Sequence, residues 1–253
     1  MKVSIITVCY NSAETIEDTI KSVLSQDYQD IEYIVIDGGS SDETLDIIDK
    51  YQDRIATIVS EPDKGIYDAM NKGIKKSTGD IVGILNSDDF YESEDVISKI
   101  VCCFDSEVDV VHGDLIFVKS DNLEKVTRFY SLPNFKPWKL RFGWMPPHPA
   151  TFIKKSVYDK YGLYKINYKI SADYEVFVRF LFVNKVSYKH ISKILVRMRD
   201  GGVSTSGLKS SMTLNKEIVR ACCENGIYTN LFFLTLKLPF KLLELLKRPK
   251  AND

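Results

Sequence analysis

Histidine is scarce in this chain of 253 residues, and long apolar segments are missing. Three histidines, His112, His148 and His190, are too few for the ligand set that a two-metal phosphohydrolase site requires. Five cysteines, an odd number with no C-x-x-C spacing, argue against a disulfide framework and a zinc site, so we expect reduced packing residues in a cytosolic protein. No uncharged apolar run approaches the roughly 18–20 residues that span a bilayer. No signal peptide is expected, because the chain enters a strand directly.

The net charge is −1, which gives no support for a nucleic-acid partner. The charges are unevenly distributed, since residues 1–100 contain 21 acidic and 9 basic side chains, and residues 101–253 contain 14 acidic and 25 basic ones. A basic second half suits an anionic partner such as a phosphate group or a membrane surface. The G-x-G-x-x-G and Walker motifs are both missing, which argues against a dinucleotide-binding fold and a P-loop.

Strand and helix patterns alternate four times in the first ninety or so residues. Apolar, β-branched segments at 3–9, 31–36, 55–59 and 80–85 predict strands, and helices are expected between them. Asn11 and Glu14 have the spacing of a capping box, which predicts a first helix that begins there and reaches about Gln26. This alternation predicts an α/β fold with a mostly parallel central sheet, flanked by helices and joined by right-handed crossovers.

Polar side chains follow the expected strands, at the edge of the sheet where parallel strands end and ligands bind. They are Tyr10, Asn11, Asp37, Asp63, Lys64, Asn86, Asp88 and Asp89. Asp88 and Asp89 would repel each other unless a cation or water lies between them, and oxygen ligands suit Mg²⁺ or Mn²⁺. The pair therefore predicts a divalent-metal site that holds a diphosphate. The alternative is that both residues cap the next helix.

The second half predicts helices at 94–104, 155–161, 171–181 and 208–224, and strands at 108–113, 115–119, 126–130 and 193–199. Five prolines, Trp138, Trp144 and His148 lie between residues 133 and 149, which indicates either an irregular binding loop or a loop that covers the core. Asp173 and Glu175 lie in the first turn of an expected helix. They are either acids that the helix dipole favours or the source of a general base.

The segment from residue 231 to residue 250 contains eleven Leu and Phe residues, five basic residues and one acid. It is broken by Lys237, Pro239 and Lys241, so it cannot span a membrane. Such a segment can lie in the membrane interface or pack on the protein. We therefore divide the chain into one domain at 1–225 and an amphipathic basic tail at 226–253.

Four motifs carry a resemblance to a known family: IITVCYN (5–11), VIDGGSSD (35–42), SEPDKGIYDAMNKG (60–73) and GDIVGILNSDD (79–89). The chain resembles the inverting family-2 glycosyltransferases with the GT-A fold, and in particular bacterial enzymes of capsule, O-antigen and exopolysaccharide assembly. The resemblance implies a nucleotide-sugar-binding half at 1–112 and an acceptor-binding half at 113–225. The segment after residue 225 lies outside it.

The resemblance also implies roles for individual residues. The nucleotide would be contacted by Val8, Tyr10, Asn11, Asp37, Lys64, Gly65 and Asn71. The family's D-x-D element falls on Asn86-Ser87-Asp88, with Asn86 in place of the first acid and Asp89 directly after it. Asp88 would bind the metal, and Asp89 is a second candidate. Asp173 takes the place of the family's catalytic base, although Ala172 replaces the usual preceding acid. We add two inferences from side-chain chemistry: Arg197 or Arg199 would hold the diphosphate, and the loop with Trp138, Trp144 and His148 would form the acceptor wall.

The implied reaction is metal-assisted transfer of a sugar from a UDP-sugar to a hydroxyl of a glycan, in a single displacement that inverts the anomeric centre. The expected acceptor is linked to polyprenyl diphosphate, and the expected location is the cytoplasm, at the inner face of the cytoplasmic membrane through the tail. Two alternatives stay open: transfer directly to polyprenyl phosphate, and a non-catalytic module that binds nucleotide sugars. The transferred sugar and the oligomeric state cannot be deduced from the sequence.

Overall fold

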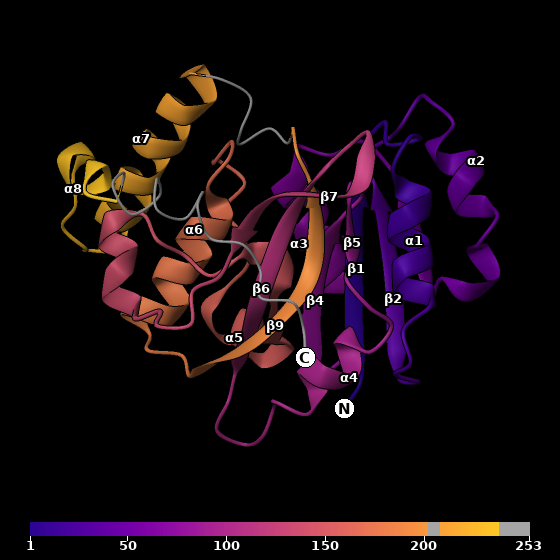
Figure 1. Cartoon of the computed structure of the whole chain (residues 1–253), viewed down its shortest axis with the longest axis horizontal. Coiled ribbons are helices and arrows are strands. Elements are labelled where there is room, and N and C mark those ends of the chain that lie inside the picture. The colour runs from indigo at the N-terminus through magenta and orange to yellow at the C-terminus, as the bar shows by residue number, and fades with distance from the viewer. Residues whose placement is uncertain (202–207, 238–253) are drawn as a thin grey trace.

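The computed structural model describes residues 1–201 and 208–237, and a nine-stranded sheet forms its centre (Figure 1). Eight strands follow one another across the sheet in the order β3 (Thr57–Ser60), β2 (Ile31–Asp37), β1 (Val3–Cys9), β4 (Ile81–Asn86), β8 (Thr151–Lys154), β6 (Val110–Lys119), β9 (Tyr188–Arg199) and β5 (Asp89–Tyr91). Strand β7 (Asn122–Tyr130) pairs with β6. The first four strands are parallel, β8 is antiparallel to both of its neighbours, and β9 is parallel to β6. The predicted α/β class is therefore confirmed.

Helices cover both faces of the sheet, because alternate residues of each strand point to opposite sides. Ile6 and Val8 of β1 belong to the core beneath α3 (Ile66–Lys76), α5 (Lys155–Tyr161), α6 (Ala172–Phe177) and α7 (Leu208–Glu224). Val3 and Ile5 belong to the core beneath α1 (Ile16–Leu24), α2 (Thr44–Asp49) and α4 (Val96–Val101). The parallel strands β1, β2 and β4 are buried on both sides, which explains their largely continuous apolar sequences.

One predicted helix start is wrong, and one alternative for the acidic pair is excluded. Helix α1 begins at Ile16 after Thr15 and not at Asn11, which has a left-handed backbone (φ 48°) and accepts a hydrogen bond from Ser41 N at 2.9 Å. Asp88 and Asp89 do not cap the next helix either, because Asp89 begins β5 and α4 starts later, after Asp95. Both polar segments are used to shape the edge of the sheet.

The second half differs from the prediction in the length of its strands. One ten-residue strand, β6, replaces two predicted ones, and the predicted boundary between the two halves at 112/113 falls inside it. Strand β9 starts at Tyr188, five residues before the predicted position. The proline-rich loop contains only two short 3₁₀ turns, η2 (Pro137–Phe142) and η3 (His148–Ala150), and α6 continues as a π-helical turn, η4 (Val178–Val183).

The described part of the tail packs on the domain. Helix α8 (Leu231–Thr235) is capped by the Asn230 side chain, which accepts a hydrogen bond from Phe233 N, and Leu234 is buried in the core. The rest of the tail (238–253) and the loop at 202–207 lie outside the described residues. Within residues 1–201 and 208–237, no helix is long and apolar enough to cross a membrane.

Candidate active site at the carboxyl edge of the sheet

The ends of the first four strands lie at one level. Cys9 is opposite Asp37, Val8 is opposite Asn86, and Asp37 is opposite Ser60. The residues that follow these strands therefore form a continuous edge, as the sequence predicted for a parallel sheet. Val8 itself is buried between β2 and β4, so its side chain belongs to the core and does not face the edge.

Tyr10 and Asp63 approach each other across Gly38. A Cβ atom on Gly38 would lie 2.4 Å from Asp63 Oδ2 and 3.4 Å from Tyr10 Cδ2, so a larger residue there would displace the Asp63 side chain. Tyr10 is 63% exposed and Asp63 is half-buried, which leaves both available to a ligand.

Asp37 has a different position from the one expected for a nucleotide contact. It is fully buried, and its carboxylate accepts hydrogen bonds from Gly39 N, Ser40 N, Ser40 Oγ and Ser60 Oγ. Burial raises the pKa of Asp37, but these hydrogen bonds outweigh it and hold the pKa below its usual value. Asp37 therefore organises the loop after β2, and its direct contact with the nucleotide stays a prediction.

The loops after β1 and β4 are joined by a hydrogen bond between the hydroxyl groups of Ser12 and Ser87, 2.8 Å apart. Asn11 links the first loop to the loop after β2, because Asn11 N donates to Ser40 Oγ at 2.8 Å and Asn11 Oδ1 accepts from Ser41 N. These bonds fix the relative positions of the loops at the edge.

Asn86, Asp88 and Asp89 form a cluster of oxygen atoms at the end of β4. Within the described residues, Asn86 Oδ1 and Asp89 Oδ1 are buried and have no hydrogen-bond partner. Burial raises the pKa of Asp88, and burial together with the charge of Asp88 raises that of Asp89 well above its usual value. Unpaired buried oxygens are costly, and a bound cation would satisfy them.

This oxygen-only cluster fits Mg²⁺ or Mn²⁺. Among residues 1–201 and 208–237, no three His, Cys, Asp or Glu side chains are grouped to hold a metal ion. A metal held by one or two carboxylates would take its other ligands from water and from a substrate diphosphate, which is the usual mode for Mg²⁺.

Arg199 contacts the backbone of the turn that carries Asp88. Its guanidinium donates to the Asp88 carbonyl at 2.8 Å, forms an ion pair with Asp18, and lies over the Phe90 ring. It is 7% exposed, so it fixes the turn that carries Asp88 and has little surface for the predicted diphosphate contact. Arg197 is also engaged, because it pairs with Glu92 at 2.6 Å.

The loop before α3 presents Lys64 and Gly65 to solvent. Gly65 has φ +108° and donates its N–H to Asp63 Oδ1 at 2.7 Å, so this glycine shapes the approach to α3. Asn71, which was expected to flank the nucleotide, is buried and clamps Tyr164: its amide group donates to Tyr164 O at 2.8 Å and accepts from Tyr164 N at 2.9 Å. Asn71 therefore acts within the fold.

Asp173 lies next to the first turn of α3, whose N-terminus is at the same sheet edge. Its Oδ1 accepts a hydrogen bond from Tyr174 N at 2.8 Å and lies 3.4 Å from the Tyr67 hydroxyl of α3. Burial raises the pKa of Asp173 to about 6, against opposing hydrogen bonds from Tyr174 N and Tyr67. A carboxylate with this pKa is ionised at neutral pH and is more basic than an ordinary aspartate, as a general base requires.

Glu175 differs from Asp173 although only two residues separate them. It is fully buried and forms ion pairs with Arg179 at 2.9 Å and Lys165 at 3.0 Å. Despite burial, these partners lower the pKa of Glu175. Glu175 is therefore part of a structural ion-pair network, which leaves Asp173 as the candidate base in this turn.

The loop at residues 133–149, which contains Trp138, Trp144 and His148, packs partly in the core. His148 Nε2 hydrogen-bonds to the Tyr164 hydroxyl at 2.8 Å, its ring packs edge-on against Phe177, and burial lowers its pKa to about 4. Trp144 packs against the same core, whereas Trp138 is 53% exposed on η2. Of the three side chains that were expected to form the acceptor wall, Trp138 has the largest free surface.

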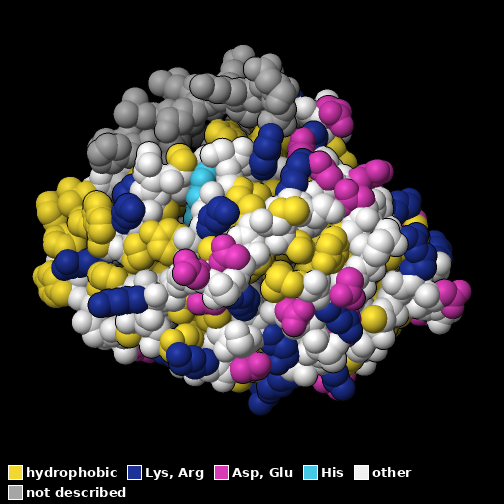
Figure 2. All heavy atoms as spheres, turned by 90° about the horizontal axis from the view of Figure 1, so that it is seen from below, with side chains coloured by type: hydrophobic (Ala, Val, Ile, Leu, Met, Phe, Trp, Pro, Cys, Tyr) yellow, Lys and Arg dark blue, Asp and Glu magenta, His cyan; other side chains and the backbone are white. Residues whose placement is uncertain are grey.

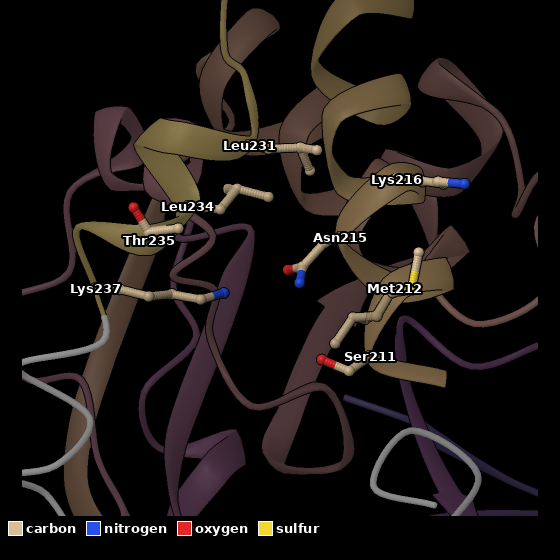
Figure 3. Close-up of a pocket in the computed structure, with 9 residues that line it drawn as sticks. Ser211, Met212, Asn215, Lys216, Leu231, Leu234, Thr235 and Lys237 are labelled. Carbon is tan, nitrogen blue, oxygen red and sulfur yellow. The ribbon is translucent and has the colours of Figure 1, made fainter. Parts of the chain in front are cut away.

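A pocket of about 310 Å³ lies between α7 and α8 (Figure 3). It is lined by Ser211, Met212, Leu214, Asn215, Lys216, Leu231, Leu234, Thr235 and Lys237. This lining combines apolar side chains with two lysines and contains no carboxylate, so the pocket lacks the groups that the chemistry at the sheet edge needs.

The sequence model of "Glycosyl transferase family 2" matches residues 4–162, which is more than half of the chain. The chain belongs to glycosyltransferase family 2. It is 35% identical over 179 residues to an uncharacterized glycosyltransferase of Mycobacterium tuberculosis, covering 70% of this chain and 68% of that protein. It is 29% identical over 181 residues, with the same coverage, to a PGL/p-HBAD biosynthesis glycosyltransferase of Mycobacterium bovis.

Solved structures confirm the GT-A glycosyltransferase fold. TarS of S. aureus (residues 1–349, in complex with UDP-GlcNAc) superposes with a TM-score of 0.70 and 18% identity, covering 94% of this chain and 72% of that one. The mannosyltransferase PcManGT of Pyrobaculum calidifontis, in complex with GDP-Man and Mn²⁺, gives a TM-score of 0.63 and 19% identity, covering 97% and 73%.

Sequence reasoning missed two residues that hold Asp173 in place. Tyr67 lies inside a recognised motif, but nothing in the motif indicates that its hydroxyl contacts the segment before α6. Glu217 of α7 accepts hydrogen bonds from three backbone amides just before Asp173. No local sequence signal distinguishes Glu217 from an ordinary surface acid of a helix.

Proposed function

We propose that this glycosyltransferase moves a sugar from a UDP-sugar to a hydroxyl of a glycan, with inversion at the anomeric carbon. Two features together carry the proposal. One is the cluster of oxygen atoms at Asp88, and the other is Asp173, a carboxylate whose pKa is raised to about 6. TarS, which shares the fold, was crystallised with UDP-GlcNAc, which supports a UDP-sugar donor.

In the proposed reaction, Asp173 accepts the proton of the acceptor hydroxyl while that oxygen forms a bond to the anomeric carbon. The bond from this carbon to the diphosphate oxygen breaks, and its electron pair leaves with UDP. The acceptor attacks the face opposite the leaving group, so an α-linked donor gives a β-linked product. A single displacement of this kind needs only one catalytic carboxylate.

Asp88 and Asp89, with Asn86 beside them, would hold Mn²⁺ or Mg²⁺. When bound, such an ion neutralises charge on the departing diphosphate. Tyr10 and Asp63 provide an aromatic face and an acceptor group for the nucleotide, on either side of Gly38.

A membrane-bound acceptor is supported by an apolar patch at the end of the molecule opposite α1 and α2 (Figure 1, Figure 2). We define this patch by six exposed side chains of η2, α7, α8 and their flanks: Trp138, Met212, Tyr228, Leu231, Phe232 and Leu236. Three basic residues, Lys136, Lys139 and Arg141, lie in η2 or directly before it. Aromatic side chains among basic ones suit an anionic membrane interface. We therefore propose peripheral binding to the inner face of the cytoplasmic membrane and a polyprenyl-diphosphate-linked glycan as acceptor, as in capsule or O-antigen synthesis.

The test is UDP release from a panel of UDP-sugars with Mn²⁺ or with EDTA. Wild type, Asp88→Ala and Asp173→Asn are compared with Asp80→Ala, a control at the opposite end of β4. Loss of Asp88 is expected to cost at least about 10²-fold in turnover, and loss of the base about 10²–10⁴-fold with nucleotide binding retained. Nucleotide binding without turnover in wild type would favour the non-catalytic alternative. Transfer to polyprenyl phosphate alone would favour the alternative in which the sugar is transferred directly to that lipid.

Membrane binding is tested separately by sedimentation with anionic and with neutral vesicles. The double variant Tyr228→Ser/Phe232→Ser should lose binding to anionic vesicles, and Val183→Ser, which removes an exposed apolar residue elsewhere, should keep it. Equal binding by all three proteins would contradict a membrane contact at the patch.

A further inference from the structure

Glu217 lies in the middle of α7, beyond the residues that the family model matches, and is only 9% exposed. Its carboxylate accepts three backbone hydrogen bonds: from Lys169 N at 2.7 Å, Ile170 N at 2.9 Å and Ser171 N at 3.0 Å. Hydrogen bonds from amides to a carboxylate are charge-assisted, and three on one carboxylate define the position of the donating segment.

The segment 169–171 leads directly into α6 and needs these bonds. Ser171 occupies the N-cap position, but its side chain makes no capping bond, and Ser171 Oγ has no partner within the described residues. The first amides of a helix lack intrahelical acceptors, and the amide of the N-cap residue Ser171 is one of them. Glu217, which lies on a different helix, provides the acceptor for this amide and for the two amides before it.

The same segment is held from its other side by α3. The Tyr67 hydroxyl donates to the Ile170 carbonyl and also lies 3.4 Å from Asp173 Oδ1. Tyr67 stacks on Tyr164 with ring centroids 5.9 Å apart, and Asn71 clamps the backbone of Tyr164. The backbone that carries Asp173 is therefore fixed between a carboxylate on α7 and a hydroxyl on α3.

We infer that Glu217 is a positioning residue for the general base: by binding the amides of residues 169–171, it sets the place of Asp173 relative to the donor site. The inference rests on the proposed function, in which Asp173 is the base. A displacement of about 1 Å at a reacting group is enough to cost about 10²-fold in rate.

The charge of Glu217 acts on the base as well. Burial is the main cause of the raised pKa of Asp173, and the negative charge of Glu217 adds to it. The other titratable groups that face Asp173 are Tyr67, Tyr164 and Tyr174, whose pKa values burial raises well above 10, so they stay neutral in the working range. Loss of the charge at position 217 therefore moves the pKa of the base downward.

The experiment compares Glu217→Gln with Glu224→Gln in the full-length chain. Glu224 lies seven residues further along α7, and its carboxylate binds the side chains of Lys165, Arg220 and Tyr168. Both variants remove one negative charge from the same helix, but only Glu217→Gln turns an amide NH₂ group toward the backbone N–H donors of the segment that carries the base. Steady-state transfer, nucleotide affinity and the pH dependence of kcat/KM are measured for both, with Asp173→Asn alongside.

Glu217→Gln is expected to lower kcat by about 10–10²-fold, to leave KM for the nucleotide sugar within about twofold, and to shift the acid limb of kcat/KM to lower pH. Glu224→Gln should stay within about threefold of wild type. Glu217→Asp, which keeps the carboxylate on a shorter side chain, should recover part of kcat. Amide hydrogen exchange at residues 169–171 should be slow in wild type and faster in Glu217→Gln.

Wild-type kcat in Glu217→Gln, together with an inactive Asp173→Asn, would overturn the positioning role and leave the proposed function standing. An active Asp173→Asn would instead overturn the base assignment itself. If Glu217→Gln does not fold, Glu217→Asp and the wild-type exchange rates still decide: a fully active Glu217→Asp with fast exchange at residues 169–171 in wild type would refute the inference.

Discussion

Replacing Asp173 by asparagine should make the protein more stable while it removes transfer activity. Asp173 is largely withdrawn from water, and burial raises its pKa from 3.8 to about 6. A carboxylate whose pKa is higher in the folded state than in the unfolded chain favours folding when it is protonated and opposes folding when it is ionised. Asparagine has nearly the same shape, has no charge, and keeps an oxygen that can accept the hydrogen bond from Tyr174 N.

The magnitude follows from the two pKa values. One pH unit corresponds to about 1.36 kcal/mol, so the difference between 3.8 and about 6 costs about 3 kcal/mol in the free energy of unfolding once Asp173 is ionised. The cost is absent well below pH 3.8, develops as the unfolded chain ionises above that value, and is complete above about pH 6. At pH 7.5 the Asp173→Asn variant should therefore melt roughly 6–12 °C above wild type, given 2–4 °C per kcal/mol for a chain of this size.

The assay is thermal unfolding followed by circular dichroism at pH 7.5 and at pH 4.5, with Glu175→Gln as the matched control in the same turn. Glu175 is ion-paired and its pKa is lowered, so loss of its charge leaves Arg179 without its partner and should destabilise the protein by about 3–5 kcal/mol. The advantage of Asp173→Asn should shrink at pH 4.5. A melting temperature of Asp173→Asn at or below that of wild type at pH 7.5 would refute the view that Asp173 is held in a desolvated site.

Three further predictions concern the base, the loop after β2 and the core. The kcat/KM of wild type should fall about tenfold per pH unit below a pKa of about 6, because Asp173 must be ionised to accept a proton; an acid limb near pH 4 would contradict this. Asp37→Asn should lower the free energy of unfolding by about 2–3 kcal/mol in urea titrations, since an amide NH₂ would face the N–H donors of the loop after β2; unchanged stability would show that these bonds contribute little. Gly83→Ala should destabilise the protein by about 1–3 kcal/mol, because the new Cβ would lie 2.5 Å from the Phe152 ring; an unchanged melting temperature would mean that the ring moves freely.

Strands β1, β2 and β4 were predictable because each is a buried parallel strand with a largely continuous apolar sequence. The second half was less predictable, because its strands depend on long-range pairing. The first residues of β9, from Tyr188 to Lys193, are largely polar and partly exposed, and the first three of them pair with β6. The start of α1 was mispredicted because Asn11 satisfies Ser41 of another loop and not its own helix.

For the candidate site, the sequence predicted which acidic residues lie at the sheet edge, but it did not show which of them are free to bind a ligand. Strand ends and motifs indicated Asp37, Asp88 and Asp89 together, since all three follow parallel strands. The structure separates them: Asp37 accepts hydrogen bonds from its own loop and from Ser60, whereas Asp89 Oδ1 is buried and has no hydrogen-bond partner among the described residues. Which backbone amides and hydroxyls surround a carboxylate is a tertiary property, so strand position alone could not decide this.

By itself, the sequence determined the α/β alternation, the family and the places where acids meet the sheet edge, because these depend on local periodicity and short motifs. The family resemblance already favoured Asp173 as the base, but only the tertiary structure shows how its surroundings differ from those of Glu175. The two side chains occupy different faces of one turn: Glu175 meets the cations of Lys165 and Arg179, and Asp173 meets the neutral hydroxyl of Tyr67. The pKa of a carboxylate depends on which charges and how much water surround it, and here those neighbours come from segments that lie far apart in the chain.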